Sequence, residues 1–193
     1  MKLIAHRGNV NGPNALEENR PEYIEVAIAN GYDVEIDLRC EDHQFYLGHD
    51  EPQYYVPMSW LIKRKDKLWI HCKDLKSLGV LSSSPIDFHY FWHQEDDFTL
   101  TSKNYIWTYP GKPYTLKSII VMPENNLNLI DFYQIKEYDV YGVCTDYPNL
   151  ISYENSALLY RDWETNLGSL YIHHIHHILL FDRSQLNLNY FQA

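Results

Sequence analysis

The chain has 193 residues, of which 45% are hydrophobic and 15% aromatic, which is enough for one domain with a core and leaves room for an appendage. Its formal net charge of −10 disfavours nonspecific binding to nucleic acid or anionic lipid, because both need a basic surface. No apolar run reaches membrane-span length, and the first one is interrupted by His6 and Arg7 before it could serve as a signal peptide. Three cysteines at spacings that match no metal motif indicate buried free thiols in a reducing compartment: Cys40, Cys72 and Cys144. We expect a cytoplasmic protein with a small substrate, no nucleic-acid partner and no transmembrane segment; its oligomeric state stays open.

A strand and then a helix open the chain. Residues 3–8 form an apolar run that turns polar and meets a glycine, which is typical of a buried strand ending in a loop and places His6 at the strand end. Apolar side chains at helical spacing follow Pro21, which suits a first helical turn, and Gly31 suits the stop. Glu17, Glu18 and Asn19 either line a site entrance or cap this helix.

Two acidic side chains lie on the next predicted strand. Residues 33–39 alternate strictly, so Glu35 and Asp37 point to one face and three aliphatic side chains point to the other. Two carboxylates on one strand face repel each other unless a cation joins them. A second short extended piece, residues 45–50, then ends in a polar corner that contains His49.

Four motifs in this order resemble the glycerophosphodiester phosphodiesterase family: a His-Arg-Gly strand end, a Glu-Asn pair before a helix, Glu-Ile-Asp-Leu and a later Gly-His-Asp. By this resemblance the chain would be a short and divergent member of the family. The family has a (β/α)8 barrel with two acid-base histidines and acidic residues that hold one divalent cation, and the resemblance implies the same here. It makes His6 and His49 the expected catalytic pair and Glu35 and Asp37 expected metal ligands. Mg²⁺ is the expected ion, with Ca²⁺ or Mn²⁺ as alternatives.

The third predicted strand, residues 67–74, departs from the family pattern. Trp69, His71 and Lys73 share one face, and polar groups on a buried strand need partners. In the resembled family this strand carries an acidic metal ligand and, two residues later, a lysine that contacts phosphate. Lys73 fits the lysine, whereas His71 stands in place of the carboxylate. We take His71 as the third metal ligand, with a spectator or substrate-contact role as the alternative; imidazole suits transition metals better than Mg²⁺ or Ca²⁺.

Short strands continue along the chain. They are expected at residues 87–93, 98–101, 105–109, 118–122 and 140–148. A loop at 54–57 leads to a short helix capped by Ser59, and two further helices are expected, one from Asp74 and one over residues 128–135. Residues 142–148, Gly-Val-Cys-Thr-Asp-Tyr-Pro, resemble the last barrel strand of the family, which extends the resemblance to about residues 1–150. Barrels of this architecture usually take about 250 residues. The predicted fold is therefore a compact (β/α)8 TIM-like barrel with several helices shortened or missing, bare loops between residues 91 and 122, and an open half-barrel as the alternative.

The resemblance ends before the C-terminal segment, residues 151–193. Its apolar spacing predicts a helical tail of uncertain role, which either covers a bare barrel face or mediates self-association. His173 and His177 would share a helix face at a spacing that binds metal. Without acidic or cysteine partners nearby, we expect no native metal site there.

The sequence thus predicts a metal-dependent phosphodiesterase that hydrolyses a glycerophosphodiester or a similar small phosphodiester. The cation and Lys73 would neutralise the anion while two histidines exchange protons, since the pKa of imidazole lies near neutrality. Arg7, Lys73 and Trp107 are the expected substrate contacts, and Lys73 is also counted as catalytic. The alternatives are a phospholipase D-like activity on a lipid headgroup and a non-catalytic domain that binds phosphorylated ligands. A cyclic-phosphate route and direct attack by water both stay open, as does which histidine is the acid.

Overall fold

The computed structural model describes residues 1–128, 131–132 and 134–152, and Met1–Ser152 form one compact unit. Residues 153–193, and with them the helical tail and the His173–His177 pair that the sequence predicts, lie outside the described residues.

One sheet of ten strands makes up most of the described chain. The strands are β1 (Lys2–His6), β2 (Asp33–Glu41), β3 (Gln44–Leu47), β4 (Tyr54–Val56), β5 (Leu68–Cys72), β6 (Tyr90–Phe91), β7 (Phe98–Leu100), β8 (Ile106–Thr108), β9 (Ser118–Val121) and β10 (Gly142–Thr145). Eight of them follow the path β4-β3-β2-β1-β10-β9-β8-β7. The long strand β2 uses one edge for β1 along residues 33–35 and then for β3 along residues 38–41, while β5 pairs with its other edge.

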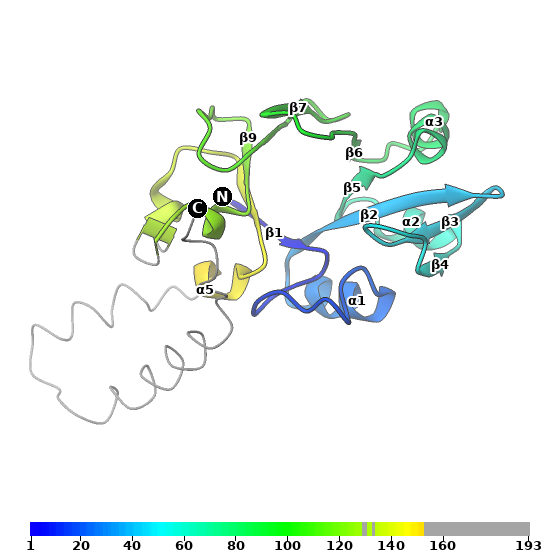
Figure 1. The fold of residues 1–193 in the computed structure, drawn as a ribbon, viewed down its shortest axis with the longest axis horizontal. Coiled ribbons are helices and arrows are strands. Elements are labelled where there is room, and N and C mark those ends of the chain that lie inside the picture. The colour runs from blue at the N-terminus through cyan, green and yellow to red at the C-terminus, as the bar shows by residue number, and fades with distance from the viewer. Residues whose placement is uncertain (129–130, 133, 153–193) are drawn as a thin grey trace, which may run out of the picture. The chain divides into compact units, whose positions relative to one another are not determined.

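The sheet is curved but does not close, so the predicted (β/α)8 barrel is wrong and the open half-barrel describes the architecture (Figure 1). Strand β6 pairs only with β5 among the described strands, and β7 ends the path as an antiparallel partner of β8. Across the opening, Ser102 accepts a hydrogen bond from the Tyr90 N–H and donates its own N–H to the Tyr90 carbonyl. Because β6 is two residues long and β7 runs antiparallel, no parallel ladder joins the two edges.

Four α-helices and two 3-10 turns accompany the strands in the described part of the chain: α1 (Pro21–Ala29), α2 (Met58–Arg64), α3 (Leu75–Ser83), α5 (Pro148–Ser152), η1 (Pro123–Asn125) and η2 (Gln134–Glu137). The predicted start of α1 at Pro21 is confirmed, and the helix predicted from Asp74 is α3, whose N-cap is Asp74 because its carboxylate accepts the Ser77 N–H. The predicted Ser59 cap is wrong, because α2 begins at Met58 and its N-cap residue, Pro57, makes no side-chain cap hydrogen bond.

The structure also tests the strand and loop boundaries predicted from the sequence after residue 53. The region between residues 92 and 122 has strands and loops but no helix, as predicted. Residues 54–56, predicted as loop, form β4, and the predicted strand at 87–93 shrinks to β6. Within the described residues, no helix has the length and apolarity that a membrane crossing requires.

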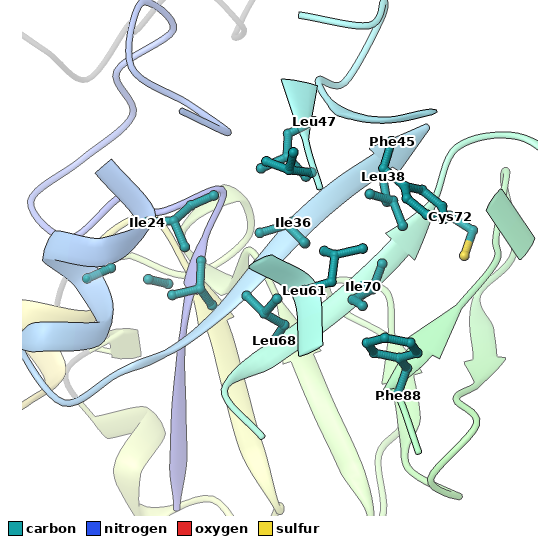
Figure 2. Close-up of a cluster of buried hydrophobic side chains, with 14 of the residues drawn as sticks. Ile24, Ile36, Leu38, Phe45, Leu47, Leu61, Leu68, Ile70, Cys72 and Phe88 are labelled. Carbon is teal, nitrogen blue, oxygen red and sulfur yellow. The ribbon is translucent and has the colours of Figure 1, made fainter. Parts of the chain in front are cut away.

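The main core lies between the sheet and the three longer helices (Figure 2). Strand β2 contributes Val34, Ile36 and Leu38 to it. Successive side chains on a strand point to opposite faces, so this packing turns Glu35 and Asp37 to the other face of β2. The hydrophobic alternation therefore positions the two carboxylates.

A second apolar layer fills the inner side of the curved sheet. It takes one residue from each of six strands: Ile4, Trp69, Phe91, Trp107, Ile119 and Cys144. The Trp107 ring centroid lies 4.5 Å from that of Phe91 and 6.1 Å from that of Trp69.

His89 is half-buried beside this layer, just before β6. Its ring lies 3.8 Å from the Trp69 ring between centroids, and its Nε2 is 2.8 Å from the Thr101 hydroxyl. Burial, with help from the charge of Lys103, lowers the pKa of His89 to about 4. The folded protein therefore holds His89 neutral at a pH where an unfolded chain binds a proton.

We expect His89→Gln to flatten the pH dependence of stability. The unfolded pKa of histidine is about 6.5, so the contribution of neutral His89 is complete above about pH 6.5 and is lost as the pH falls toward about 4. The full shift corresponds to at most about 3 kcal/mol. Urea unfolding at pH 7 and pH 4.5 measures the effect, with His43→Asn in the exposed β2–β3 turn as the control. An unchanged pH dependence in His89→Gln would contradict the assignment.

Candidate metal centre and active site

Polar side chains collect where the parallel strands β1, β2, β5 and β10 end. The register places His6 opposite Glu35 and Asp37 opposite His71 on neighbouring strands. The carboxyl ends of parallel strands are where ligands bind in open α/β sheets. This end of the sheet is therefore the candidate site.

Glu35, Asp37 and His71 form a buried trio at this end. One possible ligand atom from each residue lies within 4.8 Å of the others. Nδ1 of His71 is 3.4 Å from Oδ1 of Asp37 and 3.8 Å from Oε1 of Glu35. The spacing follows from the fold, since Glu35 and Asp37 share one face of β2 and His71 is the register partner of Asp37.

The trio fits a divalent cation. Oδ1 of Asp37 is buried and has no hydrogen-bond partner among the described residues, whereas Oδ2 accepts the Asn19 amide at 2.9 Å. A buried carboxylate oxygen without a donor is costly, so a cation at this oxygen would remove a penalty. Two carboxylate oxygens and one imidazole nitrogen are a suitable ligand set.

Two fixed cations also approach Asp37. Nε of Arg7 lies 3.0 Å from Oδ2, and Nζ of Lys73 lies 3.7 Å from Oδ1. Burial alone would raise the pKa of the Asp37 carboxyl, but His71, Arg7 and Lys73 outweigh it and hold this pKa well below its usual range. Burial and the neighbouring Asp37 charge raise the pKa of Glu35. The two carboxyls thus differ in how firmly the protein keeps them ionised.

Arg7 reaches Asp37 from a strained turn. Its φ of +52° lies in the left-handed region, which is uncommon for a residue other than glycine, and Gly8 follows at +88°. The Arg7 N–H donates to the Glu35 carbonyl at 3.0 Å, and its Nη1 donates to Glu18 at 3.0 Å. Strained backbone of this kind concentrates at functional sites. The guanidinium is thereby fixed over the carboxylates of β2.

His6 has a different partner, because its Nδ1 lies 2.8 Å from Oδ1 of Asp146. The same oxygen accepts the Asn9 amide at 2.8 Å, and the Asp146 N–H donates to Oε1 of Glu124 at 2.8 Å. Burial lowers the pKa of His6, but the hydrogen bond to Asp146 and the charge of Glu35 together raise this pKa by more than burial lowers it. The net shift is therefore upward. With Nδ1 held by Asp146, Nε2 is the nitrogen that can exchange a proton with a ligand.

His49 lies on the loop after β3, with 41% of its side chain exposed and its Nδ1 2.7 Å from Asp50. The loop is fastened to β2, since Arg39 donates to the carbonyls of Gly48 and His49, and the Gly48 N–H donates to the Asp37 carbonyl. Burial lowers the pKa of His49; the Asp37 charge opposes this shift, and the Arg7 and Lys73 charges add to it. His49 is therefore at the rim of the site and is held less firmly than His6.

The sequence-predicted residues fall into three groups. The structure brings six of them to the strand ends: His6, Arg7, Glu35, Asp37, His71 and Lys73. His49 stands at the rim. Trp107 does not belong to this group, because it is 5% exposed and packs in the inner apolar layer. Its ring contacts Phe91 and Trp69 of that layer, so its expected role as a substrate contact stays a prediction.

Three further residues build the site: Asn19 was predicted to line its entrance or to cap a helix, whereas Asp146 and Glu124 were not predicted as site residues. Asn19 caps no helix; its amide instead bonds both the N–H and Oδ2 of Asp37. Asp146 ends an apolar strand, the same signal that identified His6, so it was within reach of sequence reasoning. Glu124 gave no such signal, since it follows β9 in a turn that depends on Met122 at φ +44°.

Comparison with known proteins leaves the family open. No family model, no curated protein and no solved structure matches this chain. A function must therefore be inferred from the chemistry of the site, together with the motif resemblance.

Proposed function

We propose that this protein is a divalent-metal-dependent phosphodiesterase that hydrolyses a glycerophosphodiester or a similar small phosphodiester. The observation that carries the proposal is the buried trio Glu35, Asp37 and His71, with its unpartnered Asp37 oxygen, on strands adjoining the His6–Asp146 pair. A cation-binding group, a paired histidine and a lysine at one strand end are the groups that phosphodiester hydrolysis needs.

Glu35, Asp37 and Nδ1 of His71 would hold the cation. When bound, it would neutralise a phosphodiester anion and polarise its oxygens. Lys73, 3.7 Å from Asp37, adds a positive charge beside the same place. Arg7 is the less available cation, because Asp37 and Glu18 already engage its guanidinium.

His6 is the proposed proton acceptor. A carboxylate that holds one imidazole nitrogen fixes the tautomer and strengthens the other nitrogen as a base, as in hydrolytic triads. Asp146 does this for His6, and Asn9 and Glu124 hold Asp146 in turn. His49 at the rim is the proposed second proton-transfer group.

Metal-dependent turnover is the direct test. The full chain is stripped with a chelator and assayed on bis(p-nitrophenyl) phosphate and glycerophosphocholine, with and without Mg²⁺, Ca²⁺, Mn²⁺ or Co²⁺. We expect no turnover without metal and restored turnover after metal addition, because the Asp37 oxygen would then bind the added cation, which neutralises the phosphodiester. His43→Asn, in the exposed β2–β3 turn, is the control and should behave like the parent.

Three outcomes contradict the proposal in different ways. Full turnover in metal-free protein removes the metal from the reaction. Turnover of lysophosphatidylcholine but not of glycerophosphocholine makes the enzyme a lipid-headgroup phospholipase. Saturable binding of glycerol phosphate without hydrolysis of any diester makes the domain a non-catalytic binder.

A further inference from the structure

His71 is held against β6 by two rings. Its ring centroid lies 5.0 Å from that of Phe91 with the planes 14° apart, and 4.7 Å from that of His93 with the planes 20° apart. Phe91 is almost fully buried. The imidazole plane of His71 is therefore fixed by stacking before any ligand arrives.

The orientation of the ring within that plane is also defined. Nε2 of His71 lies 3.4 Å from the carbonyl oxygen of His93, while Nδ1 faces Asp37 at 3.4 Å and Glu35 at 3.8 Å. A carbonyl oxygen can only accept, so the proton in this contact is on Nε2. Histidines that bind a metal through one nitrogen commonly donate the other N–H to a backbone carbonyl, which fixes the tautomer.

A protonated His71 that merely neutralises the carboxylates is the competing arrangement. Asp37 already has Arg7 at 3.0 Å from one oxygen and Lys73 at 3.7 Å from the other. With these two cations in place, a neutral His71 still leaves Asp37 with two positively charged neighbours. The Asp37 oxygen nearest His71 is also the one that lacks a hydrogen-bond partner among the described residues, which favours an ion between the two side chains.

We propose that Nδ1 of His71 is a metal ligand and makes this a mixed oxygen–nitrogen site that selects transition-metal ions over Mg²⁺ and Ca²⁺. The inference rests on the proposed function for the existence of the cation, and it adds the class of ion. Imidazole suits Zn²⁺ and its transition-metal neighbours, whereas Mg²⁺ and Ca²⁺ prefer oxygen. Two carboxylates and one neutral imidazole also offer a hard cation one negative charge fewer than three carboxylates would.

Metal affinity tests the inference without reference to turnover. The tail histidines offer competing nitrogen ligands, so every protein carries the same four substitutions: His173→Gln, His174→Gln, His176→Gln and His177→Gln. Titration calorimetry then compares Co²⁺, Mg²⁺ and Ca²⁺ in this full-length parent, in His71→Glu and in His93→Phe. We expect the parent to bind Co²⁺ more tightly than Mg²⁺, and His71→Glu to lose Co²⁺ affinity on the order of 10- to 100-fold while gaining Mg²⁺ affinity.

His93→Phe is the matched control. It keeps the backbone carbonyl that holds Nε2 and an aromatic ring for the stack, so the preference for Co²⁺ should stay as in the parent. A second measurement does not depend on the folding of any variant. In the Co²⁺-loaded parent, the Nε2 proton of a ligating His71 should give an exchangeable proton resonance shifted by the paramagnetic ion.

The outcomes separate the inference from the proposed function. Equal or tighter binding of Mg²⁺ by the parent, or absence of the shifted exchangeable proton, overturns His71 as a ligand, whether or not the protein hydrolyses phosphodiesters. Preferential Co²⁺ binding that His71→Glu reverses upholds the inference, even if no diester is turned over.

Discussion

His6→Ala is expected to lower phosphodiester turnover by about two to four orders of magnitude, because a general base typically contributes that much. The proposed base loses its imidazole, while the metal trio on β2 and β5 is untouched. Steady-state turnover under saturating metal measures the effect, and calorimetry shows whether metal affinity is retained. Parent-like turnover in a verified His6→Ala preparation would remove His6 from the mechanism.

Asp146→Asn separates the base from its support. A base must be unprotonated to act, so the acidic limb of the pH–rate profile reports the pKa of His6. Asp146 raises that pKa against the effect of burial, so Asp146→Asn should move the limb to lower pH as well as slow the reaction. A purely structural role for Asp146 would slow turnover without moving the limb.

Asp37→Ala is expected to lower the free energy of unfolding by about 3–5 kcal/mol, the usual cost of removing one partner of a buried ion pair. The substitution leaves the Arg7 guanidinium and the Lys73 ammonium beside the site without their shared carboxylate. It also removes the acceptor of the Asn19 amide. Urea unfolding in metal-free buffer measures the loss.

Glu41→Ala is the matched control, since Glu41 is an exposed carboxylate at the far end of the same strand. Its effect should stay within about 0.5 kcal/mol, as for most surface substitutions. A loss of similar size in both variants would mean that the Asp37 ion pairs contribute little to folding.

The alternation of apolar and polar residues in the sequence was sufficient to predict the part of the site that lies on β2. Val34, Ile36 and Leu38 alternate with Glu35 and Asp37, and burying the aliphatic set leaves the carboxylates one possible direction. Helix α1 likewise followed from local signals, because Pro21 can begin a helix but cannot continue one. These features depend on neighbours in the sequence, so the sequence predicted them.

Sheet closure depends on pairings that no local pattern encodes. Nothing within residues 98–100 specifies that β7 runs antiparallel to β8, and nothing in the aromatic run around β6 limits it to two paired residues. Strand β8 is only three residues long, Ile-Trp-Thr, so its sequence does not show how far along the sheet axis the Trp107 ring lies. The barrel prediction was wrong and the Trp107 contact could not be derived from the sequence for the same reason: both depend on the position of distant strands.

The pairing of His6 with Asp146 has a consequence for how the protein is made. The two residues lie 140 positions apart, one at the end of β1 and the other directly after β10. Contacts of such high sequence separation form late in folding, because a long loop must close before they can stabilise anything. During synthesis the first residue of the pair leaves the ribosome long before its partner exists. If His6 acts as the proposed base, the proposed activity requires that β10 has joined the sheet, so turnover would report assembly of the described unit.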